Sequence, residues 1–537
     1  MRRFVLVLIG LVVALVVLVG VAFGVINSGA ARAKIASTLS SALGQPVAIG
    51  SFGISLLPLP ALEAGDVRIG GADSNAAPGL ALSKLRVLPE LTSLLPGRTL
   101  TVNQVDLHGL TISIRKDKSG KWLLPVAPAP TGGGPGGPGV ELHKLQIRRG
   151  RIRVVDDSLV TKGGGPTITT ISDIEAELQA AGGALKVPSF TGKLGQTTVN
   201  GSAEAGPKGA TLHLASESIE NADLPALFAL AAMPPYPDLS ISGKAPFELN
   251  TNIAPDFKTF VATGKASIER VKFGTFILDR MSSSFRFDKG IFSLDPFVFT
   301  FFGGKQQGAV AIDLNQPAPV YTIKSSVTGL DVNRALSATT SNKDFLFGTA
   351  NLSTNVKGSG SSAPAIQKSL AGTAKFQLVN GVIKNFPLLA AVNQALGMTE
   401  GTGKDTKFES LSATAAIGGG KAQTNDLLLK AGELSMTGTG QLGFDQSLDF
   451  KLKTVVSAAK SQQLLGKLGP AGRLRNAQGE LVIPVNVSGT TLAPKYGVDV
   501  GSVAKQQVKE QVQEGVQKGL MRLFQKNQPA GKDSTKP

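Results

Sequence analysis

The chain begins with an uncharged apolar run and then alternates apolar and polar residues over most of its length. The run at residues 4–26 (FVLVLIGLVVALVVLVGVAFGVI) would span a hydrocarbon core of about 30 Å as a helix. It predicts a transmembrane anchor over residues 1–27. A cleaved secretory signal is the alternative, because Ala31-Arg32-Ala33 resembles a cleavage site, although the apolar core of such signals is usually shorter, about 7–15 residues.

After this run, the spacing of Ile35, Leu39 and Leu43 predicts a short helix that ends at Gly44 and Pro46. From there the dominant period is two, which is typical of strands with one apolar and one polar face. The clearest segments are TISIR at 111–115, RIRVV at 151–155, FELNTNI at 247–253, LDFKL at 448–452 and ELVIPVNV at 480–487.

Three segments, beginning near Ile171, Leu278 and Phe408, share one pattern of glycines and apolar residues. Each holds two glycines at the same spacing, with an apolar residue at one fixed distance before the first and another at a fixed distance after it. The glycine pairs are Gly183 and Gly201, Gly290 and Gly308, and Gly420 and Gly438. The apolar residues are Ile174, Met281 and Leu411 before, and Phe190, Phe297 and Leu427 after.

A repeat of about 110–130 residues exceeds the period of the small solenoid families, and no copy alternates strands with long helices. We therefore expect a mainly β fold. Its core would be one long, twisted, mostly antiparallel sheet curled into a groove, with an N-terminal transmembrane helix and short interspersed helices.

The expected domains follow from these patterns and from the Pro/Gly-rich composition of residues 125–139. After the anchor we expect a helix and β region at 28–124, a linker at 125–139, a central β-groove region at 140–260, one β-groove repeat at 261–368, a second at 369–500, an amphipathic helix at 501–526 and a disordered tail at 527–537.

Charge and orientation suggest where the chain resides. Lys and Arg number 55 against 38 Asp and Glu, a net charge of +17 that favours an anionic partner. Nucleic acid is not expected, because the basic residues are spread along the chain and Trp and Tyr number only 1 and 3. Arg2 and Arg3 favour a cytoplasmic N-terminus. In a bacterium this predicts a single-pass protein of the cell inner membrane, with most of the chain periplasmic.

The stretch from Phe287 to Leu314 is rich in phenylalanine. Its FVFTFF segment at 297–302 is apolar on both faces of an expected strand. Two interpretations stay open: a filled core between packed sheets, or a curved sheet whose apolar lining leaves space for acyl chains. Candidate lipid-groove lining residues are Phe285, Phe287, Phe297, Phe299, Phe301, Leu427 and Leu429.

Enzymatic chemistry finds little support in the sequence. The chain has no Cys, and its three histidines, His108, His143 and His213, lie far apart without metal-ligand spacing. No Walker-type loop and no nucleophile elbow is present. We expect no catalytic, cofactor-binding or metal residue and no cofactor. The arginines Arg149, Arg151 and Arg153 most simply form a solvated strand face, with headgroup contact as the alternative.

The order of several N-terminal pieces resembles the AsmA family of bacterial envelope proteins. These pieces are the basic start, the apolar run, the short helix ending at residues 44–47, GSFGISLLPLPALEAGDVRI at 50–69 and LSKLRVLPELTSLLPGRTLTVNQVDLHGLTISIRKDKSGKWLL at 82–124. Residues from about 370 to 456 resemble the C-terminal domain of that family. The resemblance implies similarity to bridge-like lipid transfer proteins, with a β-groove that supports phospholipid transport between membranes and outer-membrane homeostasis.

The expected partners follow from that resemblance and from the ends of the chain. They are phospholipid acyl chains, the inner membrane through residues 4–26, and outer-membrane proteins or envelope assembly machinery. The stripe of Val508, Val512, Val516, Leu520 and Phe524 predicts a helix that lies on a membrane or caps the sheet. The alternative function is a non-transporting scaffold or assembly factor for outer-membrane proteins.

Overall fold

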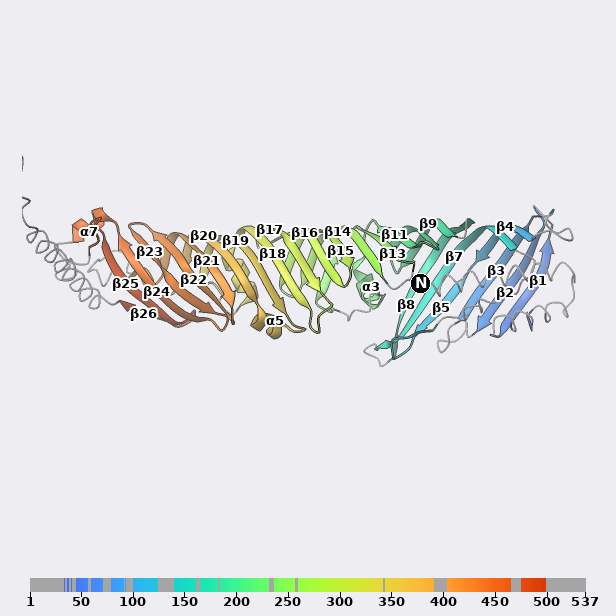
Figure 1. Ribbon diagram of the computed structural model, residues 1–537, viewed down its shortest axis with the longest axis horizontal. Coiled ribbons are helices and arrows are strands. Elements are labelled where there is room, and N and C mark those ends of the chain that lie inside the picture. The colour runs from blue at the N-terminus through green and yellow to red at the C-terminus, as the bar shows by residue number, and fades with distance from the viewer. Residues whose placement is uncertain are drawn as a thin grey trace, which may run out of the picture. The chain divides into compact units, whose positions relative to one another are not determined.

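The computed structural model describes residues 45–498 with gaps at 57–58, 71–78, 91, 93–99, 124–139, 161–164, 182–183, 231–235, 256–258, 341–342, 391–402 and 465–474, together with Ala33, Ala36, Ser37 and Ser40. These four residues are helical, as expected there. The expected anchor, linker, C-terminal helix and tail lie outside the described residues. The described strands form a 26-stranded sheet, so the fold is mainly β as the alternation predicts (Figure 1).

The chain divides into two compact units, residues 1–296 and 297–537. The domain boundaries expected from the sequence stay predictions. The first unit contains the 3-10 helix η2 (Asn221–Asp223), α3 (Leu224–Leu230) and the strands β1 (Val47–Ser55), β2 (Ala61–Gly70), β3 (Gly79–Pro89), β4 (Leu100–His108), β5 (Thr111–Lys116), β6 (Trp122–Leu123), β7 (Val140–Val160), β8 (Pro166–Ala181), β9 (Ala184–Leu194), β10 (Thr197–Gly206), β11 (Gly209–Ser216), β12 (Leu239–Ser242), β13 (Phe247–Ile253), β14 (Phe260–Phe273) and β15 (Phe276–Asp288).

Most pairings of the first unit are antiparallel, but β7 lies parallel to both β4 and β5. The early half of this strand pairs with β4 and its later half with β5. A bend at Gly109, where φ is +68°, separates the two partners. Gly109 N–H donates to the Arg148 carbonyl at 2.8 Å, so the bend itself is also bonded to β7.

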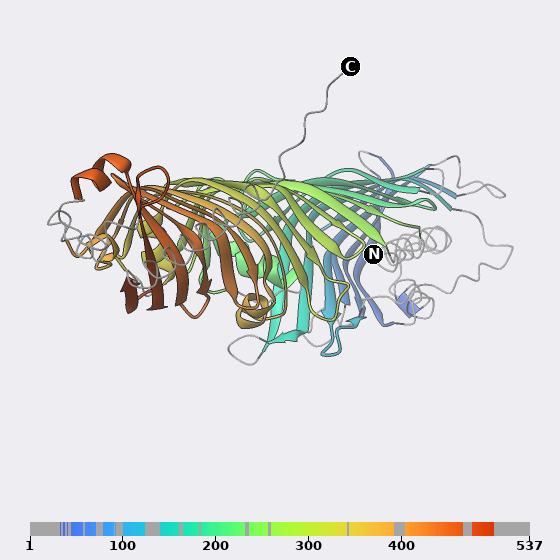
Figure 2. The same ribbon diagram turned by 60° about the vertical axis from the view of Figure 1, so that its left-hand side comes forward.

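The strand β16 (Ile291–Phe301) begins in the first unit and ends in the second. The second unit continues with β17 (Gly304–Asp313), β18 (Val320–Asp331), α4 (Val332–Thr339), β19 (Leu346–Ser359), α5 (Ala363–Ser369), β20 (Ala371–Ile383), β21 (Thr406–Gly418), β22 (Lys421–Ala431), β23 (Leu434–Gly443), β24 (Ser447–Val456), α7 (Ala458–Leu464), β25 (Leu481–Thr490) and β26 (Pro494–Val498). Figure 2 shows these strands bending along their length.

Each unit has a main filled core on a limited set of strands, and the first unit has a second, smaller buried cluster of Ile241, Ala245 and Val271 on and beside β12 and β14. In the first unit the core lies on β1 to β5, β7 and β8, where Val102, Val105 and Leu107 are fully buried. In the second it lies mainly on β19 to β25, where Met436 and Val485 are fully buried. The strand expected at 480–487 is confirmed as part of that core, because alternate residues of β25 from Leu481 onward are buried.

The second glycine of each expected repeat occupies the same environment in the sheet. Gly201, Gly308 and Gly438 lie in β10, β17 and β23. A Cβ atom built on any of them would lie closer than 3.0 Å to a backbone carbonyl oxygen of the next strand, in the order His213, Lys324 and Lys451. The shared pattern therefore marks structurally equivalent positions where the neighbouring backbone excludes a side chain.

The first glycines of the last two repeats are also equivalent. Gly290 and Gly420 have φ of 77° and 76° in the hairpin turns after β15 and β21. Side chains other than glycine rarely adopt this conformation. Gly183 lies outside the described residues.

Replacing Gly438 by alanine is expected to lower the free energy of unfolding by about 1–3 kcal/mol, because the new methyl group must displace backbone of β24. Gly418 provides the control, since a Cβ there meets nothing within 4 Å. Urea unfolding of both variants measures the difference. Equal midpoints for the two would contradict the steric role assigned to the repeat glycines.

Candidate apolar binding face

The alternation in the middle of the first unit places apolar side chains on one face of β11 to β15. In β13, Phe247 and Leu249 alternate with the exposed polar residues Glu248, Asn250 and Asn252. Phe247 and Leu249 are only half-buried, whereas Ile253 at the end of the strand is buried. Phe247 and Leu249 therefore differ from the filled core of the same unit, where several side chains are fully buried.

The strand register aligns these apolar residues into rows across the sheet. One row runs through Leu214, Leu249, Gly264 and Phe285 on β11, β13, β14 and β15. The ring of Phe285 lies over Gly264, where a Cβ would collide with it. A flat aromatic ring over a glycine thus forms part of the surface.

The next row contains Phe287, the second predicted lining residue of the first unit. Ala262 of β14 lies opposite Phe287 of β15, and the Phe287 ring stacks on Phe260 with 5.1 Å between centroids. Phe260 itself is 46% exposed. We call the following half-buried residues the open face of the first unit: Leu212, Leu214, Phe247, Leu249, Phe285 and Phe287.

The three predicted phenylalanines of β16 lie side by side. The ring centroids of Phe297 and Phe299 are 5.0 Å apart, and those of Phe299 and Phe301 are 5.3 Å apart. All three side chains are half-buried. The sequence prediction that they share one strand face agrees with this continuous aromatic row.

In the second unit, β17 to β21 also present apolar rows. One row joins Val327, Leu352, Phe376 and Ala413, and another joins Val310, Ile323 and Val356. Leu352, Phe376, Val310 and Ile323 are half-buried, and we call these four residues the open face of the second unit.

The two predicted lining leucines of β22 differ from the predicted phenylalanines in their burial. Leu429 is 4% exposed and belongs to the filled core of the second unit, and the half-buried Leu427 packs against that core. Leu429 therefore offers almost no surface to a ligand. The seven candidate residues thus fall into five on open surface and two at or in a filled core.

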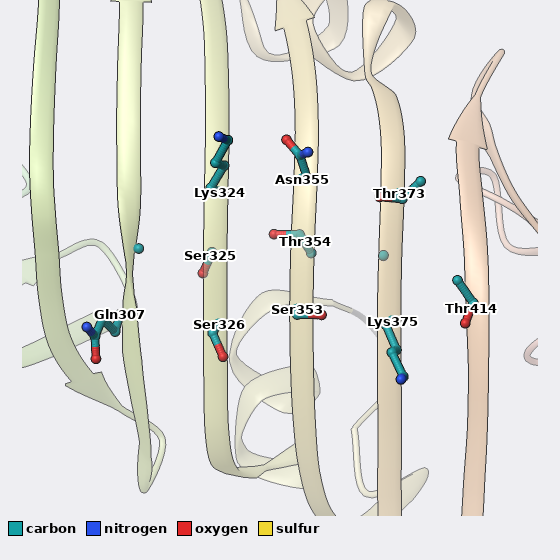
Figure 3. Close-up of a pocket in the computed structure, with 12 residues that line it drawn as sticks. Gln307, Lys324, Ser325, Ser326, Ser353, Thr354, Asn355, Thr373, Lys375 and Thr414 are labelled. Carbon is teal, nitrogen blue, oxygen red and sulfur yellow. The ribbon is translucent and has the colours of Figure 1, made fainter.

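The opposite face of the second unit holds a polar pocket of about 520 Å³, which the sequence did not reveal. Figure 3 shows side chains from β17 to β21 around it. One row across it contains Gln307, Ser326, Ser353, Lys375 and Thr414, and the adjacent row contains Lys324, Asn355 and Thr373. These residues come from five strands and lie between Gln307 and Thr414, more than a hundred positions apart, so no local motif marks them.

An acid lies at the β21 edge of the pocket. The carboxylate of Asp426 accepts the Thr414 backbone N–H at 2.7 Å. This hydrogen bond, followed by one from the Thr414 side chain, holds the pKa of Asp426 below its usual value. Asp426 is therefore ionised and already engaged with the backbone.

Neither a metal cluster nor a membrane-spanning helix occurs in the described part of the chain. No three His, Asp or Glu side chains there gather closely enough to hold an ion. None of the helices there has the length and apolar character needed to cross a bilayer. Of the histidines, His213 pairs with Asn250 across β11 and β13 at 2.8 Å.

Residues 253–427 match the model of the AsmA family. This segment of the chain belongs to the AsmA family. The AsmA segment holds the whole polar pocket and every predicted lining residue except Leu429. The match confirms the family inferred from the sequence. It overlaps the region from about 370 to 456, the second of the two regions whose sequence resembles the family. No curated protein and no solved structure gives a significant match.

Proposed function

We propose that this AsmA protein binds phospholipid acyl chains on its open faces and supports phospholipid transport between the membranes of a bacterial envelope. The observation that carries the proposal is the set of apolar rows on β11 to β15 and on β17 to β20. In these rows Leu249, Phe285 and Phe376 are half-buried and belong to none of the filled cores. Binding is passive and needs no covalent step.

The energetics favour such a ligand. Each methylene removed from water contributes about 0.8 kcal/mol, so an acyl chain gains several kcal/mol even when the face covers only part of it. The alternate side chains of the same strands, such as Glu248 and Asn252, are exposed and polar, which suits a sheet with one solvated face. In this proposal residues 4–26 anchor the chain in the inner membrane and the sheet lies in the periplasm.

Native mass spectrometry of the detergent-solubilised full chain tests this function. The expected spectrum shows the protein with co-purified phospholipid, and stripped protein takes phospholipid up again on incubation with vesicles. A lipid-free species that also takes up none would contradict the proposal.

A non-transporting scaffold is the second candidate, and an exposed hairpin favours it. Phe273, Phe276 and Ile277 at the β14–β15 turn are 49%, 38% and 44% exposed. Such a cluster is typical of a protein-docking site. A triple serine variant should lose envelope function with lipid content unchanged if the scaffold role dominates, and should keep function if transport does.

A further inference from the structure

We propose that the polar pocket on β17 to β21 binds a phosphate ester that carries hydroxyl groups, the chemistry shared by sugar phosphates and glycerophosphate headgroups. None of the twelve described residues around the pocket is acidic, and two are lysines, Lys324 and Lys375. The remaining polar side chains are hydroxyls and amides. This composition offers cations to a phosphate and neutral donors and acceptors to hydroxyl groups.

Several basic residues elsewhere on the sheet are paired with acids across strands. Lys186 lies opposite Glu204 at 3.6 Å, and Arg270 lies opposite Asp279 at 2.6 Å. Opposite-charge pairs of this kind stabilise neighbouring strands. The pocket lysines have no acid opposite them.

The register explains why the lysines have no acidic partner. Lys324 faces Ala309 and Asn355 on its two neighbouring strands. Lys375 faces Ser353 and Thr414 in the same way. Within the described ranges neither lysine makes an ion pair, so both ammonium groups remain for a ligand or for solvent.

The residues between the lysines are also without side-chain partners. In the part of the chain that the structure describes, the side chains of Ser326, Ser353, Asn355 and Thr373 make no hydrogen bond. Figure 3 shows Lys324 and Lys375 extending in opposite directions on either side of these shorter side chains. A ligand over this floor would meet hydroxyl and amide groups at its centre and an ammonium group toward each end.

The pocket is separate from the proposed acyl site. Ser326 and Ser353 alternate along their strands with Val327 and Leu352, which belong to the apolar rows on the other face. The backbone of the sheet therefore lies between the pocket and the open face of the second unit. A molecule in the pocket is a second ligand, and its binding does not depend on the acyl site.

Isothermal titration of the full chain in nonionic detergent tests the proposal with inorganic phosphate, glycerol 3-phosphate and glycerol as probes. We expect the two phosphates to bind, glycerol 3-phosphate more tightly, and glycerol alone not to bind. A dihexanoyl phosphatidylglycerol arm identifies the source, counting only the binding that the Lys324→Gln/Lys375→Gln variant loses. Tighter binding of this kind than glycerol 3-phosphate indicates a lipid headgroup, and weaker binding indicates a soluble ester.

The variant Lys324→Gln/Lys375→Gln should weaken phosphate binding at least about tenfold, since each ammonium group makes a charge-assisted hydrogen bond. Lys453→Gln is the matched control, because this exposed β24 lysine lies outside the pocket. The double variant should keep its co-purified phospholipid. Absence of phosphate binding, or equal binding by the double variant and the control, would overturn the proposal.

Discussion

Replacing Leu249 by aspartate is expected to reduce bound phospholipid at the open face of the first unit at least about tenfold while the chain stays folded. The side chain is half-buried, so water can still solvate the carboxylate in the lipid-free protein. An acyl chain on this row would cover that charge, and covering an unpaired charge costs more than the 1.4 kcal/mol that corresponds to a factor of ten. The loss is measured as the ratio of bound lipid to protein in native mass spectra. The chain used also carries Phe376→Asp, which disables the open face of the second unit.

Asn252→Asp provides the matched control for this prediction. It adds the same charge to the same strand, but on the exposed polar face. It should leave bound lipid unchanged in the same background. If Leu249→Asp unfolds the chain instead, the face is covered by protein and the acyl site does not exist there.

Replacing Val485 by aspartate is expected to have the largest effect on stability, a loss of at least about 3–5 kcal/mol in the free energy of unfolding. Val485 is 0% exposed and lies in β25 opposite Leu452, which is also in the filled core. The unpaired carboxylate would have neither water nor a partner. Thermal or urea unfolding of the second unit measures the loss.

The neighbouring residue supplies the control for this core prediction. Asn486 follows Val485 on β25 and points to the exposed face. Asn486→Asp should shift the free energy of unfolding by less than about 0.5 kcal/mol, as surface substitutions usually do. Similar losses for both variants would mean that β25 is not part of a filled core.

The sequence predicted local features of the fold well because they depend on neighbouring residues. Alternation located β13, β24 and β25, since a strand places successive side chains on opposite faces. The repeat glycines Gly308 and Gly438 were also visible, because the close approach of the next strand demands glycine at a fixed spacing.

The burial of the apolar rows could not be predicted in the same way. Leu427 and Leu429 alternate just as Phe297 and Phe299 do, yet Leu429 lies in a filled core. What covers a row depends on side chains from distant strands and on the helix α7, whose Leu464 joins that core. Nothing in the local pattern of β22 encodes this.

The polar pocket escaped prediction for a related reason. Lys324 and Lys375 are far apart in the sequence and become neighbours of one pocket only through the register of β18, β19 and β20. The parallel pairing of β7 with β4 and β5 is similar, since it depends on which strands come together rather than on the composition of any one strand.

Site-specific photocrosslinking in bacterial cells tests the central claim most directly. A benzophenone side chain at Leu249 or Phe376 should give phospholipid adducts. The same group at Asn252, on the polar face of β13, or at the exposed Gln377, beside Phe376 on β20, should give none. Adducts confined to the two apolar positions are the predicted result. Equal adducts on both faces, or none at any position in a folded chain, would contradict acyl binding on the open faces.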